Sequence, residues 1–443
     1  MCRLWLAMAS IARFGALPSF RKFRLFRNFA AGTYVAAVGA LFVLTSMGVA
    51  AHEARADKGR ALAVGSWSTG HMTPLPSSVV QYSNQTLREV VHTSIGSDRV
   101  RVRIANTFGS ATLHIGSVHI ALAGSGSSIV PGTDQSLTFG GSESIDIPAG
   151  AVALSDAADF RQHGLTDVAV SIYLPGTVAG ETTTFFQGTT FLAFGNKVAA
   201  IDLPGATALG EWPFLFGVDV SAPDDGATVV AFADSATIVS QWPNALAERL
   251  AAKYIRNLGV VSVALAGNRL LHNSAGPSGP DPRWGQSLLT RFDRDVLGQP
   301  GVKHVIVWIG LNDIAGPGAF YPASEVVSQA DLIAGFRQLI ARAHEKGLTI
   351  QACTISPMGG NTSLPGFDTP EHEAARVAIN DWIRTSGEFD DVVDADLALR
   401  DPAAPTRLLA IYDSGDHLHP NLAGGRAIAR AIDLKRFESR WSN

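Results

Sequence analysis

Two carboxylates and two imidazoles lie within residues 413–420, which read Asp-Ser-Gly-Asp-His-Leu-His-Pro near the end of the chain. Asp416 and His419 are three residues apart, a spacing that lets a carboxylate lie beside an imidazole and fix its orientation and tautomer. An imidazole held in this way can act as a general base, and it then requires a nucleophile. On its own, the segment could equally be a polar loop between a strand and the last helix.

Three segments upstream offer the missing groups, each directly after an expected buried strand. Ser235 lies where a strand-to-helix turn would expose its hydroxyl. Gly267 lets a backbone N–H approach a ligand, and Asn312 offers a side-chain amide on a turn that begins with glycine. Singly, these residues could be a helix cap, a packing glycine and an Asx turn. Together with the base and its orienting carboxylate they supply what acyl transfer needs, which favours a catalytic site.

The elements that must position these groups follow residue 226, where apolar strand-like runs alternate with helical runs. Such alternation indicates a parallel sheet with helices on both faces, whose ligands bind beyond the carboxyl ends of the strands. The expected strands are 228–233, 260–265, 304–310, 349–355 and 391–393. The expected helices are 242–253, 286–297, 330–346, 371–386 and 421–432.

Residues 62–223 have a different pattern, with short alternating strands separated by Gly and Pro turns, which predicts an all-β sandwich or jelly roll. The glycine- and proline-containing segment 221–226 marks a domain boundary, so the α/β domain spans 226–443. We expect Trp67 and His71 to be core residues rather than platforms for a sugar. The expected strands are 99–106, 112–122, 136–139, 144–147, 167–174 and 182–187. In the first of these, Val100, Val102 and Ile104 should face one way and Arg99, Arg101 and Arg103 the other.

In residues 226–443 the sequence resembles the SGNH, or GDSL-type, hydrolase family. The resemblance rests on Asp234-Ser235, then Gly267, then Gly310-x-Asn312-Asp313, then Asp416-x-x-His419-Pro420, in that order. The all-β region is similar to the N-terminal half of two-domain bacterial members. The resemblance implies a flavodoxin-like three-layer sheet, no cofactor, and a serine esterase. It further implies that Ser235, Asp416 and His419 are catalytic, and that Ser235, Gly267 and Asn312 form the oxyanion hole.

The first of these blocks departs from the family pattern Gly-Asp-Ser-x-Thr-Asp-Gly. Ala233 replaces the first glycine, and Ile238 and Val239 replace the later Asp-Gly. An alanine at position 233 is tolerable if its φ is negative and costly if it is positive. The loop before Trp242 is also short. These departures motivate an alternative hypothesis, a catalytically impaired SGNH scaffold that acts as a glycan- or ligand-binding module. The esterase hypothesis is favoured because all four catalytic groups remain.

The first 56 residues are expected to be a signal peptide or an N-terminal anchor. Basic residues between Arg21 and Arg27 precede an uncharged stretch, 28–51, that ends in small residues typical of a cleavage site. The apolar run approaches the length of a membrane span, but the small-residue exit favours cleavage. Either way the rest of the chain is expected to be exported, periplasmic or extracellular, with membrane contact only through this segment if it is uncleaved.

Composition excludes several other classes of protein. A net charge of −4 and the absence of a long basic run beyond the N-terminal segment argue against nucleic-acid binding. With only Cys2 and Cys353, neither a disulfide framework nor a cysteine metal site is expected. His344 and His372 lack partners at ligand spacing, so we predict no metal. The expected partner is a small-molecule or polysaccharide ester substrate.

Overall fold

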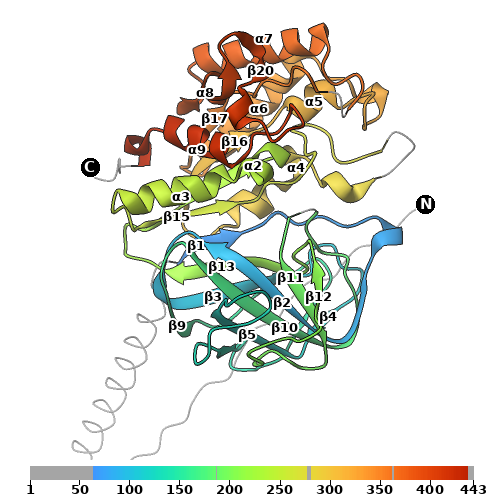
Figure 1. Cartoon of the computed structure of the whole chain (residues 1–443), viewed down its shortest axis with the longest axis vertical. Helices are drawn as coiled ribbons and strands as arrows, with labels where there is room; N and C mark the ends of the chain where they lie inside the picture. Colours follow the sequence, from blue (N-terminus) through green and yellow to red (C-terminus); the bar gives the residue numbers. More distant parts are fainter. Residues whose placement is uncertain (1–62, 186, 277–280, 362–363, 438–443) are drawn as a thin grey trace, which may run out of the picture. The chain divides into compact units, whose positions relative to one another are not determined.

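The computed structural model describes residues 63–185, 187–276, 281–361 and 364–437 (Figure 1). The predicted signal peptide or anchor, residues 1–56, lies outside the described residues. Within the described residues a β-rich part precedes an α/β part, and both belong to one compact unit, residues 61–443. The division into two domains at residues 221–226 stays a prediction. None of the helices in the described ranges is long and apolar enough to cross a membrane.

The α/β part is built on a sheet of five parallel strands in the order β15-β14-β16-β17-β18. In chain order this is 2-1-3-4-5, the order of flavodoxin-like sheets, and the predicted fold class is confirmed. Ligands of such sheets bind where the strand order reverses, which here is between β14 and β16. The strands are β14 (Ala227–Ala233), β15 (Leu258–Ser262), β16 (Val302–Trp308), β17 (Thr349–Cys353) and β18 (Asp391–Val393).

The two faces of this sheet bury separate apolar cores, because successive side chains of a strand point to opposite faces. Val230 and Phe232 of β14 enter one core, which α4, α6 and α7 cover, and Val229 and Ala231 enter the other, which α3 and α9 cover. α3 and α9 pack side by side (Figure 1). The α-helices are α2 (Ser235–Ser240), α3 (Trp242–Ala252), α4 (Leu288–Phe292), α5 (Leu311–Ala315), α6 (Gln329–Glu345), α7 (Pro370–Thr385), α8 (Ala395–Leu399) and α9 (Leu422–Ala431).

Side-chain caps define where the longest helices begin. Ser328 and Asp331 form a capping box at α6, in which each side chain accepts a hydrogen bond from the other residue's backbone N–H. Thr369 caps α7, whose first residue is a proline, and Asn421 accepts from two N–H groups of α9. The shorter elements are η1 (Pro76–Ser78), η2 (Pro282–Trp284), η3 (Asp293–Leu297), η4 (Ala323–Glu325), η5 (Ala410–Tyr412), η6 (Leu434–Phe437), β19 (Arg400–Asp401) and β20 (Ala404–Leu408).

The β-rich part is a sandwich of two antiparallel sheets, as predicted. Its core lies between the sheets and includes Val102 and Ile104 of β3, Leu87 of β2 and Val170 of β10. The first sheet contains β1 (Ala63–Ser68), β13 (Leu215–Ser221), β3 (Ser97–Ala105), β8 (Val152–Leu154) and β9 (Ala158–Gln162). The second contains β12 (Thr207–Leu209), β11 (Thr190–Phe194), β2 (Gln81–Thr93), β10 (Thr166–Ala179), β5 (Ser117–Leu122) and β6 (Gln135–Leu137). β4 (Leu113–Ile115) and β7 (Ile145–Ile147) form a separate pair.

Several predicted elements need correction. The predicted strand 182–187 is wrong, because its described residues form only a single bridge between Thr183 and Met72. The predicted strand 112–122 is interrupted at Gly116 and becomes β4 and β5. The predicted helix 286–297 is divided, since the α-helical α4 gives way to the π-helical η3 at Asp293. The 13-residue strand β2, which pairs with both β10 and β11, was not predicted from the sequence.

The prediction that Arg103 faces away from the apolar side of β3 is correct, but Arg103 itself is buried. Arg103 is 6% exposed; it donates to Asp219 of β13 and to Gln299 before β16. Burial of this charge is offset by the ion pair with Asp219, at 3.0 Å. The first sheet of the sandwich therefore packs on the α/β part through a polar layer as well as an apolar one.

The contact between the two parts is closest where β1 meets the edge strand β15. Gly65 donates its backbone N–H to Thr228 Oγ1, at 2.9 Å, and a Cβ on Gly259 would lie 2.0 Å from the Gly65 carbonyl oxygen. Real Cβ atoms do not approach backbone so closely. The absence of a side chain at position 259 therefore permits this packing.

Gly259→Ala should push β1 away from β15 and lower the free energy of unfolding by about 1–3 kcal/mol, the usual cost of overpacking. Urea unfolding followed by circular dichroism measures this change. Gly176→Ala is the matched control, because a Cβ there would meet no atom within 4 Å. Equal stabilities of the two variants would show that the two parts are not held by this contact.

Candidate active site

The side chains of Ser235, His419 and Asp416 form one continuous chain of hydrogen-bonding contacts. Ser235 is the first residue of α2, directly after β14, and its Oγ lies 2.9 Å from His419 Nε2. His419 Nδ1 lies 2.5 Å from Asp416 Oδ2. Ser235 and His419 are both half-buried. The structure thus brings together three predicted residues from segments 184 positions apart in the sequence.

The loop before α9 determines which ring nitrogen of His419 carries the proton. Partial burial opposes ionisation of Asp416, but hydrogen bonds from the His419 ring and from the His419 and Leu418 N–H groups lower its pKa well below the usual value. Because an ionised carboxylate can only accept, His419 Nδ1 carries a proton. In the neutral ring, Nε2 is then the acceptor that faces the Ser235 hydroxyl.

A second aspartate–histidine pair occupies the same loop but points away from the serine contact. His417 Nδ1 lies 2.6 Å from Asp413 Oδ2, and Asp413 Oδ1 accepts from the N–H groups of Gly415 and His417. The His417 side chain is 53% exposed. These residues shape the loop that presents His419.

Gly267 lies in the turn after β15, and its neighbours hold it firmly. Its φ is +64°, and a Cβ would lie 2.6 Å from the Trp284 ring, so glycine is required on both counts. The Tyr321 hydroxyl donates to the Gly267 carbonyl. β15 itself ends at Ser262, earlier than predicted, but the N–H groups of Val263 and Leu265 still donate to Ala231 and Ala233 of β14. This pairing keeps the glycine turn beside the strand that leads to Ser235.

Asn312 lies in the first turn of α5, after β16, and its side-chain amide bridges two of the other loops. It donates to the Asn268 carbonyl at 3.0 Å and to Asp234 Oδ2 at 3.3 Å. Asp234 and Asn268 are the immediate neighbours of Ser235 and Gly267. The amide therefore lies between the two segments that the sequence analysis had selected as the nucleophile and as an oxyanion donor.

Two buried aspartates support these loops. Burial raises the pKa of Asp234 to about 7, although the Ala236 N–H that it accepts opposes the shift. Burial likewise raises the pKa of Asp313 to about 6, against the N–H groups of Leu270 and Leu271. Asp234 caps α2, and Asp313 ties the end of the Gly267 turn to α5. Both carboxyl groups thus fix the backbone by accepting hydrogen bonds from N–H groups.

Arg269 follows Gly267 by two residues. In the described residues its ion pair is with Glu325, at 2.7 Å, and its guanidinium lies 3.7 Å from the centre of the Tyr321 ring. Arg269 is 1% exposed. It therefore packs behind the Gly267 turn and fixes Tyr321, whose hydroxyl binds the Gly267 carbonyl.

Arg291, a fully buried residue of α4, was not predicted from the sequence. Its guanidinium donates to the carbonyls of Val263 and Ala233 and to Asn268 Oδ1, and it pairs with Asp295 at 2.9 Å. The i,i+4 spacing of Arg291 and Asp295 inside an apolar helical run is a sequence signal that could have identified it. Tyr321, in contrast, stands in a loop without any such signal.

Other predicted features are placed as follows. Ala233 is fully buried in β14 and is not among the non-glycine residues with positive φ, so the alanine is tolerated there. Cys353 is a buried residue of β17. Trp67 and His71 are 9% and 1% exposed, which agrees with their predicted place in the core. In the described ranges, no three His, Cys, Asp or Glu side chains gather in a way that could hold a metal ion.

A serine, an imidazole and a carboxylate in hydrogen-bonding sequence, at the carboxyl edge of a flavodoxin-like sheet, define the arrangement of a serine hydrolase. Residues 229–427 match the sequence model of the GDSL-like lipase/acylhydrolase family. The chain thus contains a GDSL-like lipase/acylhydrolase domain and is a hydrolase of the SGNH type.

Solved structures similar to the chain include a lipase/acylhydrolase from Enterococcus faecalis, with 16% identity and a TM-score of 0.35 over 48% of this chain and 96% of that one. A variant of an acetyl xylan esterase from Geobacillus stearothermophilus has 19% identity and a TM-score of 0.35 over 48% and 95% of the two chains. The acetyl xylan esterase AlAXEase has 18% identity and a TM-score of 0.33 over 46% and 96%. A search of curated proteins found no match.

The raised pKa of Asp234 predicts a pH dependence of stability. Folding favours the protonated carboxyl, so its contribution is complete below the usual pKa of 3.8 and is lost as pH rises through about 7. Asp234→Asn keeps a capping oxygen but cannot ionise. The free energy of unfolding of the wild type should therefore fall relative to this variant between pH 4 and pH 8, by about 1.4 kcal/mol per unit of pKa difference. Urea unfolding at successive pH values measures it, and a difference independent of pH would contradict it.

Proposed function

We propose that the chain is an exported serine esterase that hydrolyses acyl esters of carbohydrates, lipids or small alcohols through an acyl-enzyme on Ser235. The observation that carries this proposal is the 2.9 Å contact between Ser235 Oγ and His419 Nε2, with Asp416 on the opposite ring nitrogen. The GDSL-like acylhydrolase match over residues 229–427 supports the reaction class.

In the first half-reaction Ser235 Oγ attacks the ester carbonyl carbon while its proton passes to His419 Nε2. The tetrahedral intermediate collapses as the C–O bond to the alcohol breaks and His419 protonates the leaving alkoxide. In the second half-reaction His419 takes a proton from water as the hydroxide attacks the acyl carbon. The second tetrahedral intermediate collapses as its bond to Ser235 Oγ breaks, His419 returns the proton to Oγ, and the carboxylic acid leaves. Asp416 stays ionised throughout and stabilises the imidazolium.

The oxyanion of both intermediates would be held by the backbone N–H groups of Ser235 and Gly267 and by the Asn312 amide. In the described structure the Gly267 N–H has no acceptor, and the longer of the two Asn312 contacts, 3.3 Å to Asp234, is the one that a substrate oxygen would replace. One such donor is typically worth about 3 kcal/mol in the transition state.

Export is proposed from the basic and then uncharged character of the N-terminal segment. The full chain, expressed in a bacterial host and fractionated, should be recovered from the periplasm or medium. Its mature N-terminus should follow Ala51 or Ala56, where small residues provide a cleavage site. Recovery from the cytoplasm with Met1 or the next residue at the N-terminus would contradict export.

Ser235→Ala should lower kcat for p-nitrophenyl acetate by about 10³-fold or more, because no other described hydroxyl contacts His419 Nε2. Circular dichroism should show an unchanged fold. Ser324→Ala is the matched control, since Ser324 is an exposed serine of η4 that lies outside the site. Retained turnover in Ser235→Ala would end the proposal.

A fluorophosphonate probe separates the esterase from the alternative, an impaired scaffold that binds glycans or other ligands. The alternative is motivated by the altered first block and by the engagement of both Asn312 N–H groups within the protein. Labelling at Ser235 supports the esterase, and a folded protein without labelling supports the scaffold. A panel of acyl esters of different chain length, beside acetylated xylan and pectin, then defines the substrate.

A further inference from the structure

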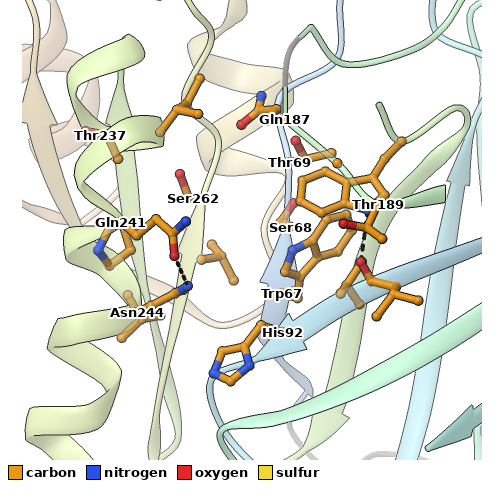
Figure 2. Close-up of a pocket in the computed structure, with 18 of the residues that line it drawn as sticks. Trp67, Ser68, Thr69, His92, Gln187, Thr189, Thr237, Gln241, Asn244 and Ser262 are labelled. Atoms are coloured by element: carbon orange, nitrogen blue, oxygen red, sulfur yellow. Dashed lines mark hydrogen bonds between the residues drawn. The ribbon is translucent and has the colours of Figure 1, made fainter. Parts of the chain in front are cut away.

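A cavity of about 560 Å³ lies where the β sandwich meets the α/β part (Figure 2). We call it the junction groove. One wall comes from the sandwich and carries Trp67, Thr69, His92, Gln187 and Thr189. The facing wall comes from α2, α3 and β15 and carries Thr237, Gln241, Asn244 and Ser262. Its volume is in the range of small-molecule sites, which is about 300–1,000 Å³.

The chemistry of the lining suits a neutral, hydroxyl-rich ligand. Amide and hydroxyl side chains stand on both walls beside apolar ones, and each of them can donate and accept hydrogen bonds. The lining contains no lysine, arginine or glutamate. Its one histidine and one aspartate, His92 and Asp167, contact each other at 2.7 Å. A charged ligand would therefore find no counter-ion of its own, whereas a polyol would find many partners.

Two indoles form the end of the groove that belongs to the sandwich. Trp67 and Trp212 pack edge to face, with ring centres 5.0 Å apart. Trp212 is only partly buried, and its Nε1 is fixed by donation to the Val90 carbonyl at 3.0 Å. A rigid aromatic surface beside amide and hydroxyl groups offers an apolar face and polar edges together, as a pyranose does. Trp67 and Trp212 therefore pack in the core of the sandwich, as predicted for Trp67, and also line the groove.

The groove is continuous with the helix that carries the nucleophile. Ile238 and Val239 line it, and Ile238 stands one turn after Ser235 on nearly the same face of α2. Three residues of α-helix rise about 4.5 Å, less than one sugar ring and its linkage. On the other wall, Gln187 donates to the Ala264 carbonyl, three residues before Gly267. Ser235 itself does not line the groove, so the acyl group of a ligand held there would extend along α2 to reach the Ser235 hydroxyl.

From these observations we infer that the junction groove binds the neutral saccharide portion of a carbohydrate ester and presents its acyl group to Ser235. This inference rests on the proposed function and names its substrate class. The sandwich then supplies one wall of the substrate site. Hydrogen bonds to sugar hydroxyls give such a site its selectivity, because an alcohol without them leaves polar groups unpaired.

Isothermal titration calorimetry of the full chain with unesterified xylotetraose, cellotetraose and chitotetraose tests binding directly. At least one neutral tetrasaccharide should bind, and Val239→Trp, which fills the groove from an exposed position on α2, should weaken that binding about tenfold or more. Asn244→Ala removes one amide from the same wall and should weaken it in the same direction. Val377→Trp is the matched control, an exposed valine on α7 outside the groove, and should bind as the wild type does.

Two outcomes of the titration would overturn the inference. The first is that no neutral tetrasaccharide binds, or that binding is equal in wild type and Val239→Trp when circular dichroism shows both folded. The second is tighter binding of tetragalacturonate than of all the neutral sugars, which would contradict a site without counter-ions.

Kinetics keep failure of this inference distinct from failure of the proposed function. The ratio of kcat/KM for an acetylated xylo-oligosaccharide to kcat/KM for p-nitrophenyl acetate should fall about tenfold or more in Val239→Trp, and should not change in Val377→Trp. Fluorophosphonate labelling of Ser235 with an unchanged ratio would reject the groove and retain the esterase. Absence of labelling and of turnover, with tetrasaccharide binding sensitive to Val239→Trp, would reject the esterase and retain the groove as a saccharide site.

Discussion

The geometry of the site depends on one buried guanidinium. Arg291 donates to the carbonyls of Ala233, at 3.3 Å, and Val263, at 2.5 Å, which leave the carboxyl ends of neighbouring strands. It also holds Asn268 Oδ1 with two nitrogens. The Val263 carbonyl and Asn268 Oδ1 would otherwise be buried without partners among the described residues, whereas the Ala233 carbonyl also accepts from the Leu265 N–H. Asp295, which Arg294 also contacts, balances the charge, so the arrangement avoids an unpaired buried ion.

These hydrogen bonds of Arg291 fix the positions of the nucleophile and of the candidate oxyanion-hole donors relative to each other. Ala233 is two residues before Ser235, and Asn268 directly follows Gly267, so the same guanidinium sets both turns. Asn312 completes the link, since its amide spans Asp234 and the Asn268 carbonyl. The general base, His419, is positioned independently of Arg291. Asn421 holds the last loop by donating to the carbonyls of Ile411 and Asp413, while its oxygen caps α9, which packs on α2.

The sheet could be predicted from the sequence because parallel strands with helical crossovers have a strong apolar periodicity. The convergence of the four loops followed, since such strands place their loops at one edge of the sheet. The strand order was implied only by the family resemblance. Which buried polar groups hold those loops could not be predicted from the sequence. Arg291, Tyr321 and Asp313 act through distant backbone carbonyls and N–H groups, and such contacts have no local pattern. The strand β2 was missed for a related reason. Its charged Arg88 and Glu89 are both fully buried, so its polar and apolar residues do not alternate with burial.

The departures of the first block from the family pattern are also explained by local packing. Ala233 tolerates its side chain because β14 is extended there, and Trp242 Nε1 donates to Thr237 Oγ1, which fastens α2 to α3 across the left-handed turn at Gln241. Valine is a better helix former than glycine, so Val239 supports the end of α2 where a glycine would weaken it. Ile238 and Val239 both lie on the wall of the junction groove, about one turn after Ser235 on α2. The altered residues therefore reshape the surface that an alcohol would meet, while the approach of the Ser235 hydroxyl to the imidazole is set elsewhere, by β14 and by the loop before α9.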